Sequence, residues 1–211
     1  MKRMFSQIVI AFGFASGGAN AAIVDFEDVV ANNTSTFGTQ ISNGYRFEPT
    51  ATTADLVFVH RSGGPCAGGC VDNGSKALGV YNGDGAAPFE VRMTAADNSI
   101  FSLFSFDYSE LFRFTTAAGG SIVLVGSLSG GGTVTESFAV DQISESYQTA
   151  NVVGFSNLTS VLFSSDRYYP TYDNINVTSG ATAVPEPGSV ALVGLAIAGL
   201  GLARRKKQKA L

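Results

Sequence analysis

The residues best suited to local chemistry lie in the stretch Cys66-Ala67-Gly68-Gly69-Cys70, which holds both cysteines of the chain. The two glycines allow the tight return that a bridge between such close positions requires. Because the closed loop is short, a Cys66–Cys70 disulfide would contribute only about 2 kcal/mol and would shape a loop rather than hold the fold. A redox site would need a Cys-x-x-Cys spacing, and a zinc site with His60 and Asp72 would offer only two thiolates and one imidazole. The spacing therefore favours a structural disulfide.

His60 is the only histidine, so any Ser-His-Asp or Cys-His catalytic site would have to use it. No Gly-x-Ser-x-Gly nucleophile elbow occurs between a strand and a helix. Beside an Arg-Ser-Gly-Gly turn, we expect His60 to be solvated. Acid and base catalysis by two carboxylates needs a pair held across a cleft, and the acidic residues give no means of choosing one. The sequence therefore predicts a protein that is not an enzyme, with a polysaccharide-active enzyme as the alternative.

Glu27 and Asp173 are candidate calcium ligands. Hard divalent ions take several oxygen ligands, and Glu27 follows the first expected strand while Asp173 begins the last. The two carboxylates could face one another if these strands pair at a sheet edge. In the alternative, which we favour, both are ordinary strand-end charges that accept hydrogen bonds from neighbouring backbone.

Tyr168 and Tyr169 are the candidate ligand contacts, because aromatic faces stack on the C–H edges of sugar rings. They precede Pro170 at an expected strand end, and Tyr81 and Tyr172 lie in comparable places. The absence of tryptophan weakens this hypothesis, and most of the sixteen phenylalanines are expected in the core.

These residues must be positioned by short strands that glycine, asparagine and serine interrupt. Period-two alternation predicts that Phe104, Phe106 and Tyr108 share one face of a strand. The expected strands cover 22–26, 44–48, 56–60, 77–81, 89–93, 99–108, 121–128, 133–140, 148–153, 160–164 and 173–177, and Gly130-Gly131-Gly132 is expected to be a hairpin turn. This spacing predicts an all-β fold, an antiparallel jelly-roll-like β-sandwich over residues 22–177. Residues 178–184, small and polar, are expected to form a linker.

The charge of the chain is distributed unevenly. Sixteen of its seventeen acidic residues lie between Ala22 and Val184, whereas the basic residues of that region are only Arg46, Arg61, Lys76, Arg92, Arg113 and Arg167. Such an acidic surface repels phosphate backbones, so we expect no nucleic acid partner.

The two ends predict export. Residues 1–21 have a basic pair, a short apolar run and the small-x-small pattern of Ala19-Asn20-Ala21, as in a cleaved secretory signal. In an exported protein, an even pair of cysteines is a disulfide by default. At the other end, an apolar helix is expected over 189–203, whose uncharged run from Val190 is roughly 21 Å long at 1.5 Å per residue. The basic tail, 204–211, resists translocation, so the helix stops transfer in the inner membrane with its charges in the cytoplasm.

Val184-Pro185-Glu186-Pro187, followed by this short helix and the basic tail, resembles the PEP-CTERM sorting signal of Gram-negative bacteria that make exopolysaccharide. The resemblance covers residues 185–211 and the preceding valine. It implies recognition by exosortase, a membrane transpeptidase-like enzyme, and delivery to the cell surface or the extracellular space. A plain membrane anchor is the alternative.

The middle of the chain resembles the lectin-like and carbohydrate-binding-module-like sandwiches that PEP-CTERM proteins often carry. The matching stretches are Val24-Asp25-Phe26-Glu27-Asp28, Ser105-Phe106-Asp107-Tyr108, Val161-Leu162-Phe163-Ser164-Ser165 and Tyr172-Asp173-Asn174-Ile175. This resemblance implies a structural Ca2+ at Glu27 and Asp173. Together the observations predict a non-catalytic surface or matrix protein that binds exopolysaccharide, with a structural or adhesin subunit as a further alternative.

Overall fold

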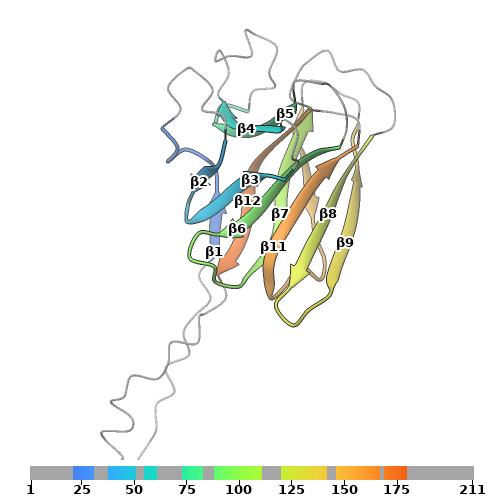
Figure 1. Cartoon of the computed structure of the whole chain (residues 1–211). Coiled ribbons are helices and arrows are strands. Elements are labelled where there is room, and N and C mark those ends of the chain that lie inside the picture. Colours follow the sequence, from blue (N-terminus) through green and yellow to red (C-terminus); the bar gives the residue numbers. More distant parts are fainter. Residues whose placement is uncertain are drawn as a thin grey trace, which may run out of the picture.

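The computed structural model describes residues 21–30, 38–50, 55–60, 73–82, 88–110, 120–141, 146–166 and 169–179. Twelve strands occupy these ranges (Figure 1): β1 Ala21–Val24, β2 Gln40–Ser42, β3 Tyr45–Pro49, β4 Asp55–His60, β5 Ala77–Asn82, β6 Phe89–Ala95, β7 Phe101–Glu110, β8 Ser121–Leu128, β9 Thr133–Ala139, β10 Gln148–Asn151, β11 Leu158–Ser165 and β12 Pro170–Ser179. Within the same ranges, no helix is long and apolar enough to cross a bilayer.

Several predictions concern residues outside these ranges. They are the signal peptide apart from Ala21, the Cys66–Cys70 disulfide, Tyr168, and the sorting tail with its helix. Residues 178 and 179, which were expected to begin the linker, belong to β12, and the rest of the expected linker lies outside the described ranges.

The strands pack as two antiparallel layers (Figure 1). In the first layer the order is β2-β3-β6-β11-β8-β9. In the second, β10 pairs with β7 and β7 with β12, while β1 and the β5–β4 hairpin lie along different parts of the other edge of β12. Leu158 opposite Phe101 links β11 to β7, so hydrogen bonding is continuous through all twelve strands. The predicted all-β antiparallel sandwich is confirmed.

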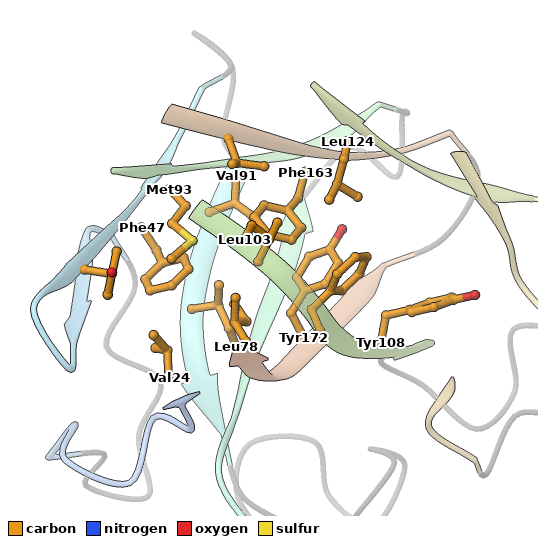
Figure 2. Packing of buried hydrophobic residues seen from close by; sticks show 14 of the residues in the cluster. Val24, Phe47, Leu78, Val91, Met93, Leu103, Tyr108, Leu124, Phe163 and Tyr172 are labelled. Carbon is orange, nitrogen blue, oxygen red and sulfur yellow. The ribbon is translucent and has the colours of Figure 1, made fainter. Parts of the chain in front are cut away.

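The core lies between the two layers and is rich in aromatic rings (Figure 2). Phe163 of the first layer meets Phe106 and Tyr172 of the second at ring-centroid distances of 5.4 and 5.0 Å. All three side chains are fully buried. Burying a side chain of this size contributes about 1.5–3 kcal/mol, so such contacts hold the layers together.

A β-bulge in β7 changes which side chains face the core. Leu103 lies opposite Val177 and Ser105 opposite Asn176, so Phe104 is an extra residue on its strand. A bulge of this kind shifts the alternation by one position. Phe106 and Tyr108 are buried, but Phe104 is 47% exposed. The prediction that Phe104 shares their face was therefore wrong.

β2 is the one described strand that the sequence pattern did not predict. Its three residues pair with β3 through a two-residue turn, Asn43-Gly44, whose φ angles are 46° and 81°. Two consecutive residues with positive φ characterise the type I′ turns that join hairpin strands, and Asn-Gly is their strongest sequence signal. The Asn43-Gly44 dipeptide is therefore the feature of the sequence that indicates this hairpin.

Candidate functional site

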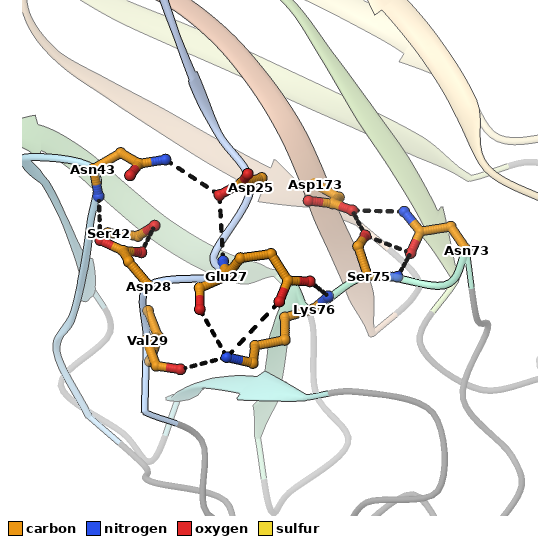
Figure 3. Close-up of polar contacts among 10 residues, drawn as sticks. All are labelled: Asp25, Glu27, Asp28, Val29, Ser42, Asn43, Asn73, Ser75, Lys76 and Asp173. Carbon is orange, nitrogen blue, oxygen red and sulfur yellow. Dashed lines mark hydrogen bonds and ion pairs between the residues drawn. The ribbon is translucent and has the colours of Figure 1, made fainter.

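The first polar cluster lies where the first and last strands meet (Figure 3). β1 pairs with β12, with Val24 opposite Ile175, so the condition under which Glu27 and Asp173 could approach one another is met. The chain then turns at Phe26, which has a φ of 58° and whose buried ring packs on Phe47 at 5.1 Å. We call residues 25–29, 42–43, 73–76 and 173 the terminal junction.

Glu27 of the terminal junction binds Lys76, which precedes β5. The backbone N–H of Lys76 donates to Glu27 Oε1 at 2.8 Å, and the Lys76 ammonium lies 3.9 Å from Oε2. The ammonium also donates to the carbonyl oxygens of Glu27 and Val29, at 2.9 and 2.8 Å. The lysine therefore holds the 27–29 turn against the start of β5.

Asp173 is buried at the other side of the same segment. Its Oδ2 accepts hydrogen bonds from the Ser75 hydroxyl at 2.5 Å and the Asn73 amide at 2.6 Å, and its Oδ1 accepts from the backbone N–H of Asn174 at 2.7 Å. Burial raises the pKa of Asp173 above the usual carboxyl range, although these hydrogen bonds favour the charged form and nearby Asp107 opposes it. The segment from Asn73 to Lys76 thus contacts both predicted carboxylates.

Asp28 fastens the β2–β3 hairpin to the terminal junction. Its carboxylate accepts from the Ser42 hydroxyl at 2.6 Å and the backbone N–H of Asn43 at 2.8 Å. Desolvation opposes ionisation of Asp28, but its hydrogen bonds, together with the positive charge of Lys76, hold its pKa below the usual value. The Asn43 side chain donates in turn to the Ile23 carbonyl and to Asp25.

The donors around Glu27 and Asp173 do not fit a calcium ion. Calcium takes six to eight oxygen ligands, whereas these carboxylates face an ammonium, an amide N–H2 group, a hydroxyl and backbone N–H groups. Across the described ranges, no three acidic, histidine or cysteine side chains gather in a way that could hold a metal ion. Calcium binding by Glu27 and Asp173 stays a prediction.

A second polar cluster lies on the outer face of the layer formed by β10, β7 and β12. Asp107 is its centre, accepting from the Thr149 hydroxyl at 2.6 Å and from the Asn174 side-chain amide at 2.9 Å. The register places Thr149 of β10 and Asp173 of β12 on either side of Asp107. The bulge brings the exposed ring of Phe104 to this same face, turned away from the core. We call Phe104, Asp107, Thr149 and Asn174 the outer-face cluster.

The outer-face cluster has the chemistry that saccharides require. An exposed aromatic ring offers an apolar face, and the carboxylate, hydroxyl and amide groups on the same sheet face can exchange hydrogen bonds with sugar hydroxyls. Simple alternation put Phe104 on the same face as Phe106 and Tyr108, so the sequence did not reveal this cluster. The paired positions of Thr149, Asp107 and Asn174 exist only once the strands are assembled.

The aromatic residues that the sequence favoured lie elsewhere. The ring of Tyr169 lies between those of Tyr81 and Phe89, at centroid distances of 4.8 and 4.7 Å, and is partly buried against the core. Tyr172 is fully buried in the core. The ring of Tyr169 therefore packs against two neighbouring rings. Contact between Tyr169 and a ligand stays a prediction.

His60 is buried, and the expectation that it is solvated was wrong. Its exposed fraction is 2%, and its Nε2 lies 3.0 Å from the Thr171 hydroxyl oxygen on β12. The Tyr147 hydroxyl lies 3.3 Å from the same oxygen. His60 ends β4, and because β5 lies between β4 and β12, the His60 side chain reaches across β5 to Thr171. Cross-strand packing, which the neighbouring turn residues do not reveal, buries this side chain.

Two hollows lie among the described turns. One, of about 270 Å³, is lined by the β2–β3 and β6–β7 turns and includes Asp97. The other, of about 430 Å³, lies between the β8–β9 turn and residues 154–157 and has no carboxylate in its lining. Neither hollow brings two carboxylates together.

No curated protein matches this chain in sequence. Similar solved structures include an arabinose-bound α-L-arabinofuranosidase, with a TM-score of 0.40 and 8% identity over 74% of this chain and 26% of that one. The tandem CBM22 domain of Paenibacillus barcinonensis Xyn10C has a TM-score of 0.46 and 13% identity, over 78% of this chain and 47% of that one. A family 29 carbohydrate-binding module has a TM-score of 0.40 and 14% identity, over 81% of this chain and 99% of that one. The chain thus spans less than half of the first two structures.

The C-terminal segment matches a known family. Residues 183–207 match the PEP-CTERM protein-sorting motif, and they include Val184, Pro185, Glu186 and Pro187. The motif implies processing by exosortase, and it occurs in exported proteins of Gram-negative bacteria that are held in the membrane before release. The chain is therefore an exported protein that carries a PEP-CTERM sorting signal.

Proposed function

We propose that this protein is cut from the membrane by exosortase and then works at the cell surface or in the extracellular matrix, where its sandwich binds polysaccharide without catalysing a reaction. The sorting motif supports the route, and the outer-face cluster supports the binding. The observation that carries the binding proposal is the exposed Phe104 ring on the same sheet face as the hydrogen-bonded Asp107, Thr149 and Asn174.

An extended saccharide suits this face for physical reasons. A sheet presents side chains at regular spacing along and across its strands, so successive sugar units can meet equivalent rows of polar groups. The mutual hydrogen bonds of Thr149, Asp107 and Asn174 fix these groups before the ligand arrives. Fixed groups lose less conformational entropy when they bind, which favours affinity.

The enzyme alternative has one observation in its favour, the pairing of Asp107 with Asp173 on neighbouring strands. Two nearby carboxylates are what glycoside hydrolysis needs. Asp173, however, is fully buried under Asn73 and Ser75, and both oxygens of Asp107 already accept hydrogen bonds. A catalytic acid must reach the glycosidic oxygen, and these contacts keep both carboxylates engaged within the protein. They therefore support binding over catalysis.

The binding proposal is tested with a glycan array and titration calorimetry on the exported protein and two variants. Phe104→Ala should weaken binding about tenfold or more, equivalent to about 1.4 kcal/mol. The matched control is Ile41→Ala, because Ile41 is 53% exposed on β2 of the other layer. Equal affinity of the Phe104 variant and the control, or silence across the array, would exclude this binding site. New reducing ends in the reaction would favour the enzyme.

A further inference from the structure

Three oxygen atoms from one turn surround a single positive charge at the terminal junction. The Lys76 ammonium donates to the carbonyl oxygens of Glu27 and Val29 at 2.9 and 2.8 Å, and the Glu27 carboxylate lies 3.9 Å away (Figure 3). The lysine side chain is 18% exposed. Two carbonyls and a carboxylate are also the kinds of ligand that calcium takes, but here a covalently attached cation occupies their centre.

The rest of the junction is organised by the same short segment. Lys76 is preceded by Ser75 and Asn73, whose side chains donate to Asp173. The two candidate calcium ligands are therefore connected through one stretch of chain, with Lys76 at Glu27 and its neighbours at Asp173. An ammonium offers three donors and one positive charge. Two of its donors bind the carbonyl oxygens of Glu27 and Val29, and its charge faces the Glu27 carboxylate.

We propose that Lys76 is the built-in cation of the terminal junction and that the domain folds and holds residues 25–29 without calcium. The ammonium neutralises Glu27 and satisfies the two carbonyls of the turn, while hydroxyl and amide donors satisfy Asp173. The calcium that the resemblance to carbohydrate-binding modules implies is thus replaced by a side chain. The proposal is independent of sugar binding, which uses the outer face of the sheet.

The first test needs no variant. The thermal unfolding of the whole chain is followed by circular dichroism in EDTA and in increasing CaCl2, with MgCl2 as a control for ionic strength. The expected midpoint is the same in all three, and equilibrium dialysis with radioactive calcium should detect no stoichiometric ion. A saturable rise of the midpoint with calcium, reversed by EDTA, would overturn the proposal.

The second test replaces the lysine. Lys76→Met keeps much of the apolar stem and removes the charge. Its matched control is Arg46→Met, because Arg46 also faces one glutamate, Glu48, at 3.7 Å, but is 41% exposed. The Lys76 variant should unfold at a clearly lower temperature than the control. In hydrogen-exchange mass spectrometry it should lose protection at residues 25–30, whereas the control should not.

Each outcome of the second test is decisive. If the Lys76 variant is as stable and as protected at residues 25–30 as the Arg46 control, Lys76 does not hold the junction and the proposal is wrong. If the Lys76 variant fails to fold while the Arg46 control folds, the lysine is essential, and calcium titration of the unmodified chain still decides whether an ion is needed. Glycan binding by the unmodified chain is measured separately, so failure of either proposal is visible by itself.

Discussion

The Ser75 hydroxyl donates a hydrogen bond of 2.5 Å to the buried carboxylate of Asp173, joining the segment before β5 to the middle of β12. The two residues are 98 positions apart in sequence. Asn73 reinforces the contact through its side-chain amide. A hydrogen bond to a charged group is stronger than one between neutral groups, so this contact fixes the 73–76 segment on the sheet.

Removal of the Asp173 carboxylate should therefore destabilise the domain. Asp173→Ala leaves the Ser75, Asn73 and Asn174 donors without their acceptor, and we expect a loss of about 1–3 kcal/mol in the free energy of unfolding. Urea denaturation followed by tyrosine fluorescence measures this. Asp97→Ala is the control, because Asp97 is exposed and contacts only nearby Ser99 in the described hydrogen bonds. A loss no larger than that of the control would show that the contact is not stabilising.

Substitution of Glu110 should have the opposite effect. Glu110 ends β7 with 1% of its surface exposed, and burial, with a smaller contribution from Asp141, raises its pKa above the ordinary value of 4.5. Because the folded state binds this proton more tightly than the unfolded state, stability falls as pH rises from the unfolded pKa through the folded one. Glu110→Gln removes this loss and should raise the unfolding midpoint at neutral pH.

The pH dependence separates this electrostatic effect from a change in packing. The gain from Glu110→Gln should shrink as the pH falls below about 4, where the native glutamate is protonated in both states. Thermal unfolding at several pH values measures this gain, and Glu48→Gln is the control, because the Glu48 side chain is 42% exposed. A gain that does not vary with pH would contradict the assignment.

A side chain at Gly126 of β8 is expected to destabilise the domain. A Cβ atom there would lie 2.7 Å from Leu158 Cδ2, 2.9 Å from Val134 Cγ1 and 3.0 Å from Phe155 Cδ1. Gly126→Ala should therefore cost about 1–3 kcal/mol through overpacking, measured by urea denaturation. Gly130→Ala is the matched control, because a Cβ at Gly130 meets nothing within 4 Å. Equal stability of the two variants would mean that the three side chains move aside freely.

The sorting motif predicts a change in the mature C-terminus. Pro185→Ala combined with Pro187→Ala should block processing, leaving a membrane-bound chain that ends at Leu211, because both prolines lie in the matched motif. Mass spectrometry of the membrane and extracellular fractions measures this. Lys209→Ala, outside the matched residues, should be processed normally. A released native protein that still ends at Leu211 would contradict cleavage by exosortase.

The sequence by itself determined the sorting signal and the class of fold. The sorting signal is a linear motif whose proline, apolar and basic parts occur in order, so no folding is needed to recognise it. Alternation and turn residues determined most strands, since the period of side chains along a strand is a local property. The expected topology permitted the pairing of the first and last strands, and the structure contains it.

Only the tertiary structure decided which side chains meet and which face they occupy. The bulge of β7 against β12 sends Phe104 outward, and His60 is buried where it reaches across β5 to Thr171 of β12. Lys76 meets Glu27 across 49 positions, a contact that no local pattern encodes. Burial, register and hydrogen-bond partners depend on strands distant in sequence, and for this reason the outer-face cluster and the terminal junction emerged only from the folded chain.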